Sequence, residues 1–259
     1  MGSTETAGAP QGAQLIARAA EILRAIPRGA VEGRRLRDLA LSAGLTEPTT
    51  HRILKALVHE QFVVQDPVTR LYRLGALAFE LGLAAGSHAQ LVESCRPRLR
   101  QLALETGDSV FLAMRTGIET VCLDRADGGY PIRAAVWEVG SRLMLGIGTG
   151  GVALLAAMRP HEAEEILGSA AYAATPIPVA ELRARVAQAR RDGFADISDK
   201  PIPGVRGIGV AVPTRAGAPV LSLSVVAVHA RLTDDHLAAI LPHLHAAARR
   251  TGAITATSS

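Results

Sequence analysis

The chain has 259 residues, 48% of them hydrophobic, and a mean hydropathy of +0.21, which excludes a disordered protein and allows two domains. It has neither an apolar run that could cross a bilayer nor a signal peptide, so we expect a cytoplasmic protein without membrane contact. The net charge is +4, and residues 14–75 carry ten Lys or Arg against six Asp or Glu, an excess typical of segments that contact phosphates.

Three helices are predicted early in the chain, over residues 14–26, 36–42 and from 47 to about 60. Gly44, four residues after Ala40, marks a tight left-handed turn, and Thr46 is the expected N-cap of the third helix. This spacing indicates a helix-turn-helix. The apolar positions on the inner faces are Leu15, Ala19, Ile22, Leu23, Ile26, Leu36, Leu39, Ala40, Ile53, Leu54, Leu57 and Val58.

A polar face on the third helix and a hairpin after it favour DNA binding. The residues of that face that can reach bases or phosphates are Thr49, His51, Arg52 and Lys55. Alternating strands at 62–65 and 70–74, joined by a turn at 66–69, are typical of the wing of a winged helix. The wing residues expected beside the DNA backbone are Thr69, Arg70 and Arg73. The alternative is an ordinary helical hairpin with a solvated basic face.

Interspersed helices and strands in the remainder predict a compact α+β domain. Helices are expected over 76–85, 91–105 with an interruption at Pro97, 151–158, 161–167, 179–191 and 233–250. Strands are expected over 109–115, 120–125, 132–136, 207–213 and 220–228. The two cysteines, Cys95 and Cys122, are too few for a disulfide framework or a structural metal site and are expected to be buried thiols.

The glycine-rich segment at residues 146–151 matches G-x-G-x-x-G. Dinucleotide binding would also need a clean strand before it and an acidic residue about 20 positions later, and neither is evident. Its glycines suit the approach of a small carboxylate to backbone amides at a helix N-terminus, where the helix dipole favours negative charge. A tight loop without a ligand is the alternative.

Several segments together resemble the IclR family of bacterial transcriptional regulators. In the N-terminal quarter they are Leu36-Arg-Asp-Leu-Ala, Gly44-Leu, Thr49-Thr-His-Arg-Ile-Leu-Lys-Ala-Leu and Tyr72-Arg-Leu-Gly75. Later they are Gly140-Ser-Arg-Leu-Met-Leu-Gly-Ile-Gly-Thr-Gly-Gly, Pro203-Gly-Val-Arg-Gly-Ile-Gly-Val-Ala-Val-Pro and Pro219-Val-Leu-Ser-Leu-Ser-Val. Three positions depart from the family pattern: Glu47 and Gly151 replace typical lysines, and Leu145 replaces a histidine.

The resemblance implies a disordered leader at 1–13, a winged helix-turn-helix domain at 14–75 and a linker helix at 76–87. A GAF- or profilin-like α+β effector-binding domain follows at 88–252, with a tail at 253–259. The implied function is a sequence-specific transcriptional regulator that binds double-stranded operator DNA as a homo-oligomer, either a dimer or a dimer of dimers. The apolar face of the linker helix either pairs between subunits or packs onto its own domain.

The resemblance also implies an effector pocket, formed by Met144, Gly148, Thr149, Ile197, Gly207, Ser224 and Val226. Leu145 and Trp137 would add apolar surface. Such a pocket is less polar than one made for glyoxylate, so we expect a larger, partly hydrophobic or aromatic organic acid. The alternative function is a hydrolase or lyase domain fused to a DNA-binding module. Because no hydrolase, metalloprotease or nucleotide motif is present, we expect no catalytic residue, metal or cofactor.

Overall fold

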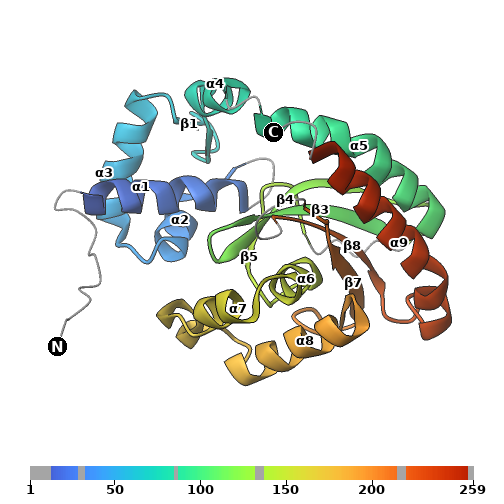
Figure 1. Cartoon of the computed structure of the whole chain (residues 1–259). Coiled ribbons are helices and arrows are strands. Elements are labelled where there is room, and N and C mark those ends of the chain that lie inside the picture. The colour runs from blue at the N-terminus through green and yellow to red at the C-terminus, as the bar shows by residue number, and fades with distance from the viewer. Residues whose placement is uncertain (1–12, 29–32, 85–86, 132–136, 215–219, 256–259) are drawn as a thin grey trace, which may run out of the picture. The chain divides into compact units, whose positions relative to one another are not determined.

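The computed structural model describes residues 13–28, 33–84, 87–131, 137–214 and 220–255. Their contacts divide the chain into two units, Met1–Ala89 and Gln90–Ser259 (Figure 1). The strand expected at 132–136, nearly all of the expected leader and the end of the tail lie outside the described residues. No helix in the described ranges combines the length and the apolarity that crossing a bilayer requires.

The first unit is a helix-turn-helix with a wing. Its helices are α1 (Ala13–Ala25), which continues into the 3-10 helix η1 (Ile26–Arg28), then α2 (Leu36–Ser42) and α3 (Glu47–His59). Strands β1 (Val63–Gln65) and β2 (Tyr72–Leu74) form an antiparallel hairpin, and α4 (Ala76–Ala84) follows. The predicted architecture of the N-terminal quarter is therefore confirmed.

Local sequence explains how α3 is placed. Gly44 has φ +62°, a conformation that costs glycine little, and the Thr46 side chain caps α3 by accepting a hydrogen bond from the Thr49 N–H at 3.4 Å. The core of the unit gathers Ile22, Leu39, Ile53, Leu54, Leu57 and Tyr72 among others. The prediction that Leu15 and Val58 belong to the core is wrong, since Leu15 is 62% exposed and Val58 is 37% exposed. Leu15 precedes the buried half of α1, and Val58 lies at the edge of the buried stripe of α3.

The second unit is built on one six-stranded antiparallel sheet with the order β5-β4-β3-β8-β7-β6. The strands are β3 (Ser109–Thr116), β4 (Glu119–Ala126), β5 (Arg142–Met144), β6 (Ala195–Ser198), β7 (Val205–Ala211) and β8 (Leu221–Val228). The helices are α5 (Ser87–Thr106), α6 (Thr149–Ala157), α7 (Pro160–Leu167), α8 (Val179–Asp192) and α9 (Asp234–Thr255), with the 3-10 helix η2 at Ala170–Ala174. This arrangement confirms the predicted α+β class.

Helices cover both faces of this sheet, α5 and α9 on one and α6 to α8 on the other (Figure 1). Leu99, Ile208 and Leu244 belong to the core under α5 and α9, whereas Leu145, Leu154 and Leu182 belong to the core under α6 and α8. Successive residues of β7 and β8 lie alternately on the two faces of the sheet, as the pleat of a strand requires. Cys95 and Cys122 are both free and buried, as expected, and burial raises the pKa of the Cys122 thiol to about 12.

Three features of this unit differ from the sequence prediction. Helix α5 is not interrupted at Pro97 but runs through it. A proline removes one intrahelical hydrogen bond, and the packing of Cys95, Leu99 and Leu102 holds the helix together across that gap. Strands β5 and β6 were not predicted, because segments of three and four residues show too little alternation to stand out from loops.

Candidate functional site

The outer face of α3 carries the first set of predicted DNA-binding residues. Arg52 and Lys55 are exposed, and His51 is half-buried. Neither cation forms an ion pair within the described residues, so both charges are available to a polyanion. Thr49 is partly engaged, because its hydroxyl accepts a hydrogen bond from the Thr46 hydroxyl at 3.0 Å.

The wing carries the second set. Asp66 fixes its turn by accepting hydrogen bonds from the N–H groups of Val68 and Thr69 at 3.0 and 2.8 Å. These bonds, the one from Thr69 foremost, lower the pKa of the Asp66 carboxyl, and Arg73 contributes less. Thr69 and Arg70 are exposed at the tip, whereas Arg73 forms an ion pair with Asp66 at 3.4 Å. Arg73 is therefore the most neutralised of the predicted wing cations.

Arg35 and Arg37 are two exposed cations that the sequence analysis left out. Arg35 is the N-cap residue of α2 and Arg37 lies in its first turn, at the start of the first helix of the helix-turn-helix. Neither has an ion-pair partner among the residues that the structure describes. The cluster of arginines around residue 35 in the sequence was the signal that could have identified them.

The second unit contains a cavity of about 140 Å³. Six of the seven residues predicted for the effector pocket line it: Gly148, Thr149, Ile197, Gly207, Ser224 and Val226. The other lining residues are Phe111, Trp137, Leu143, Gly150, Lys200, Pro201, Ile202 and Val205. Met144 is not among them, because its half-buried side chain packs against the core under α6 and α8. Leu145 is fully buried in the same core. Of Met144, Leu145 and Trp137, which were expected to give the pocket apolar surface, only Trp137 lines the cavity.

Two strand glycines let the start of α6 lie directly on the sheet. A Cβ atom at Gly209 would stand 2.9 Å from the backbone carbonyl of Thr149, and one at Gly207 would stand 3.3 Å from the Thr149 methyl group. Gly148, the N-cap of α6, has φ −97°, so its backbone is unstrained. The cavity consequently has a helix N-terminus at one wall, where amides without intrahelical partners favour an anion.

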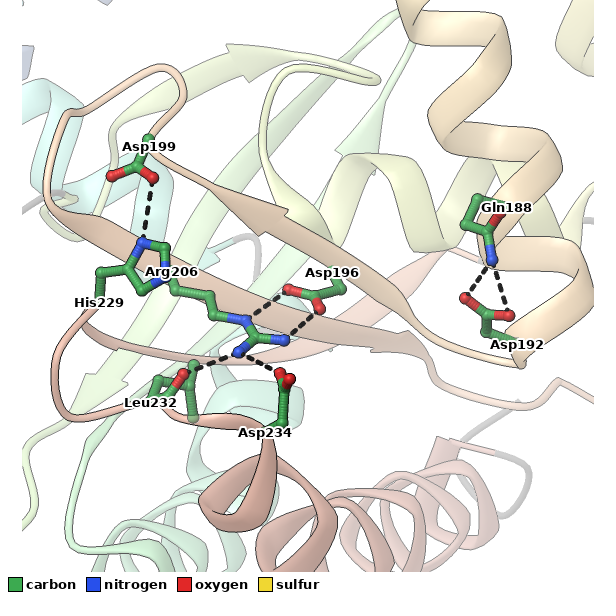
Figure 2. Close-up of polar contacts among 8 residues, drawn as sticks. All are labelled: Gln188, Asp192, Asp196, Asp199, Arg206, His229, Leu232 and Asp234. Carbon is green, nitrogen blue, oxygen red and sulfur yellow. Dashed lines mark hydrogen bonds and ion pairs between the residues drawn. The ribbon is translucent and has the colours of Figure 1, made fainter.

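The floor of the cavity lies where Ile197, Gly207 and Val226 pair across β6, β7 and β8. On the opposite face, the neighbouring residue Arg206 ties these strands to the start of α9 (Figure 2). Its guanidinium donates to Asp196 at 3.0 and 2.6 Å, to Asp234 at 2.8 Å and to the carbonyl of Leu232 at 2.9 Å. This network links β6 and β7 to the start of α9 on the side of the sheet opposite the cavity.

The walls of the cavity are mainly apolar. The rings of Phe111 and Trp137 lie 6.2 Å apart at 48°, and Ile197, Ile202 and Val226 complete an aliphatic surround. The polar side chains among the lining residues are Thr149, Ser224, Lys200 and the Trp137 indole, whose buried N–H has no hydrogen-bond partner among the residues that the structure describes. Among the lining residues described there is no His, Cys, Asp or Glu, and the described chain holds no cluster of three such residues suited to a metal ion.

Comparisons with known proteins identify both units. A family model described as the bacterial transcriptional regulator IclR C-terminal domain matches residues 83–253, and one described as the IclR helix-turn-helix domain matches residues 15–67. The HTH-type transcriptional repressor AllR of Klebsiella pneumoniae is 28% identical over 231 residues, which cover 88% of this chain and 84% of that protein.

Solved structures match over almost their whole length. A transcriptional regulator from Alicyclobacillus acidocaldarius aligns with a TM-score of 0.74 and 24% identity, covering 93% of this chain and 98% of its own. An IclR homologue from Microbacterium hydrocarbonoxydans, solved in complex with 4-hydroxybenzoate, aligns with a TM-score of 0.69 and 20% identity, covering 93% and 99% of the two chains. These likenesses support the fold.

Proposed function

Because the chain belongs to the IclR family of bacterial transcriptional regulators, we propose that its second unit binds a small organic acid and that this binding changes the affinity of the first unit for operator DNA. The observation that carries the proposal is the cavity that gathers six of the seven expected effector residues beside the N-terminus of α6. Its dimensions and lining indicate the class of ligand.

The cavity suits a ligand of about one ring. Its volume of about 140 Å³ is close to the roughly 150 Å³ of an apolar engineered cavity that binds benzene. Amides at the start of α6, with the hydroxyls of Thr149 and Ser224, would hold the carboxylate, while Phe111 and Trp137 contact the apolar body. The Trp137 N–H, which has no partner within the described ranges, favours a ligand with a second hydrogen-bond acceptor. The 4-hydroxybenzoate complex of the Microbacterium protein is consistent with this class.

For DNA, we propose that α3 enters the major groove and that the wing lies along the adjacent backbone. Thr49, His51, Arg52 and Lys55 would then face bases and phosphates, with Thr69, Arg70 and Arg73 on the wing. Arg35 and Arg37, at the start of α2, would add phosphate contacts.

We also propose that the protein works as a dimer or a dimer of dimers, since one recognition helix reads too few base pairs to specify an operator. Helix α4 supports this proposal. Phe79, Leu81 and Leu83 are 67%, 50% and 62% exposed, and no α4 side chain is fully buried in the described part of the chain. Pairing of α4 between subunits would remove this apolar surface from water.

The second unit, in this proposal, senses its ligand and does not transform it. The described lining residues include no His, Asp or Glu to serve as a general base, their one amine, Lys200, is ion-paired with Glu181, and the curated relatives are repressors.

A thermal-shift screen of small carboxylic acids tests the effector proposal, because a ligand that binds only the folded state raises the melting temperature. Monocyclic aromatic acids should stabilise the wild type, and a Gly148→Val variant, whose side chain would enter the cavity, should lose that shift. An equal shift in both proteins would contradict the proposed site.

A further inference from the structure

Lys200 is the one cationic side chain among the described lining residues of the cavity. It lies in the loop between β6 and β7, which Asp199 holds by accepting from the Gly204 N–H at 2.9 Å and contacting His229 at 3.0 Å (Figure 2). Asp199 thereby braces this loop and ties it to His229, just after β8. The loop presents Lys200, with Pro201 and Ile202, to the cavity.

The Lys200 ammonium reaches across to the first turn of α8. It donates to both carboxylate oxygens of Glu181, at 2.9 and 3.1 Å. Glu181 also accepts from Arg185 at 2.8 Å, and Arg185 donates to the carbonyl of Ile147, just before α6, at 3.4 Å. The pKa of Glu181 is lowered by these partners, by Lys200 first and by Arg185 next.

This cluster has one more cation than anion, and it borders the wall where α6 begins. If Lys200 moves away from Glu181, Glu181 still has Arg185 as an ion-pair partner. The exchange therefore leaves no carboxylate without a cation. The Lys200 side chain is 56% exposed and that of Glu181 33%, and exposed ion pairs of this kind contribute little to stability. A ligand anion in the partly closed cavity is a stronger competitor, because charge-assisted bonds strengthen away from water.

We propose that Lys200 selects the charge of the effector: a bound monocyclic acid replaces Glu181 as the partner of the Lys200 ammonium, and Glu181 remains with Arg185. This inference rests on the proposed effector function and assigns most of the discrimination between an acid and its neutral isostere to one residue, beyond the smaller preference that the α6 amides supply. Neutral amides fit the same walls but leave Lys200 with Glu181.

The chain offers a direct assay for this exchange. Trp137 is its single tryptophan and lines the cavity, so tryptophan fluorescence reports occupancy, and calorimetry provides an independent Kd. The probes are acid and amide pairs: benzoate with benzamide, 4-hydroxybenzoate with 4-hydroxybenzamide, and phenylacetate with phenylacetamide. The wild type should bind at least one acid about 10- to 100-fold more tightly than its amide, as expected for a hydrogen bond to a charged partner.

Three variants of the full chain distinguish a role of Lys200 in acid binding from a merely structural role of its ion pair with Glu181. Lys200→Met keeps the length of the side chain and should reduce the preference for acid to less than about threefold, whereas Lys200→Arg should keep it. Glu181→Gln removes the competing carboxylate and should tighten acid binding by about two- to fivefold while leaving amide binding unchanged. A merely structural role of the ion pair would not produce that gain.

Lys55 supplies the matched control, since Lys55 and Lys200 are the only lysines in the sequence. Lys55→Met should leave acid binding unchanged and weaken DNA binding. Equal acid affinity in the wild type and Lys200→Met would overturn the role of Lys200 and leave the effector site standing. Failure of every acid in the panel to bind the wild type would overturn both this inference and the proposed effector class.

Discussion

At the scale of single residues, the glycines of β7 position the proposed effector site as much as its polar side chains do. Gly207 and Gly209 leave room for the start of α6, so that its free amides reach the cavity. A side chain at Gly209 would meet the backbone of Thr149 at 2.9 Å, whereas one at Gly207 would meet the methyl groups of Thr149 and Val226 at 3.3 Å. Glycine is therefore required at position 209 by the close approach of the Thr149 backbone, and its conformational freedom is not used.

Replacing Gly209 by alanine should show this requirement. The added Cβ would meet the Thr149 carbonyl and the Ser224 hydroxyl, each at 2.9 Å, so α6 must shift. We expect a lower melting temperature and weakened acid binding, measured by calorimetry. Gly129→Ala is the control, because a Cβ there meets nothing within 4 Å. Unchanged acid affinity in Gly209→Ala would contradict the role of the α6 N-terminus.

Arg52 is the residue that tests the DNA-binding face. Its guanidinium is exposed and without an ion pair in the described chain, so Arg52→Ala should weaken DNA binding and reduce the slope of log K against log salt by about one. Fluorescence anisotropy over a salt series measures both. Arg183→Ala, which removes an exposed arginine paired with Glu164 in the second unit, should change neither.

At the scale of elements, the prediction of each helix or strand depended on its length and on residues that mark its ends. Helix α3 was predictable because Gly44 and Thr46 mark its start. Strands β3 and β4 were predictable because each has eight residues and the Thr116-Gly117 turn separates them. Strand β6 was missed because four residues show too little alternation of polar and apolar side chains. The hairpin loop that presents Lys200 was therefore missed as well.

The prediction of pocket residues also depended on the length and the marked ends of the elements that carry them. Residues on long or glycine-marked elements, such as Thr149 and Ser224, line the cavity. Met144 was misplaced because it lies at the end of the short strand β5, where one residue of register decides which way a side chain points. Phe111 was overlooked, since a buried aromatic on a central strand looks like ordinary core in a sequence.

Helix α4 is the element that we propose pairs between subunits. Because its apolar side chains are exposed in the single chain, the double variant Phe79→Glu with Leu81→Glu should dissociate the assembly without unfolding the first unit. Light scattering at micromolar concentration measures the mass. Glu80→Gln, an exposed change on the same helix, should leave the assembly intact. A wild type that is already monomeric would contradict the proposed dimer.

At the scale of the whole molecule, the proposed function is a coupling between two units that fold around separate cores. An effector alters DNA affinity only if it binds differently to the DNA-competent and DNA-incompetent states. Variants in one unit should therefore leave the binding function of the other intact while changing or removing the coupling.

The most direct test measures that coupling in the purified full chain. The preferred duplex is selected from a random-sequence pool, and its Kd is measured by anisotropy at fixed salt with and without the best-binding acid. We predict an acid-induced change in Kd of about 5- to 150-fold in the wild type. The φ of −97° at Gly148 suits any residue, and a Cβ there meets only the Leu143 side chain, at 3.3 Å, so Gly148→Val should bind the duplex normally and ignore the acid. A chain that selects no sequence, or a Gly148→Val response equal to that of the wild type, would contradict the account.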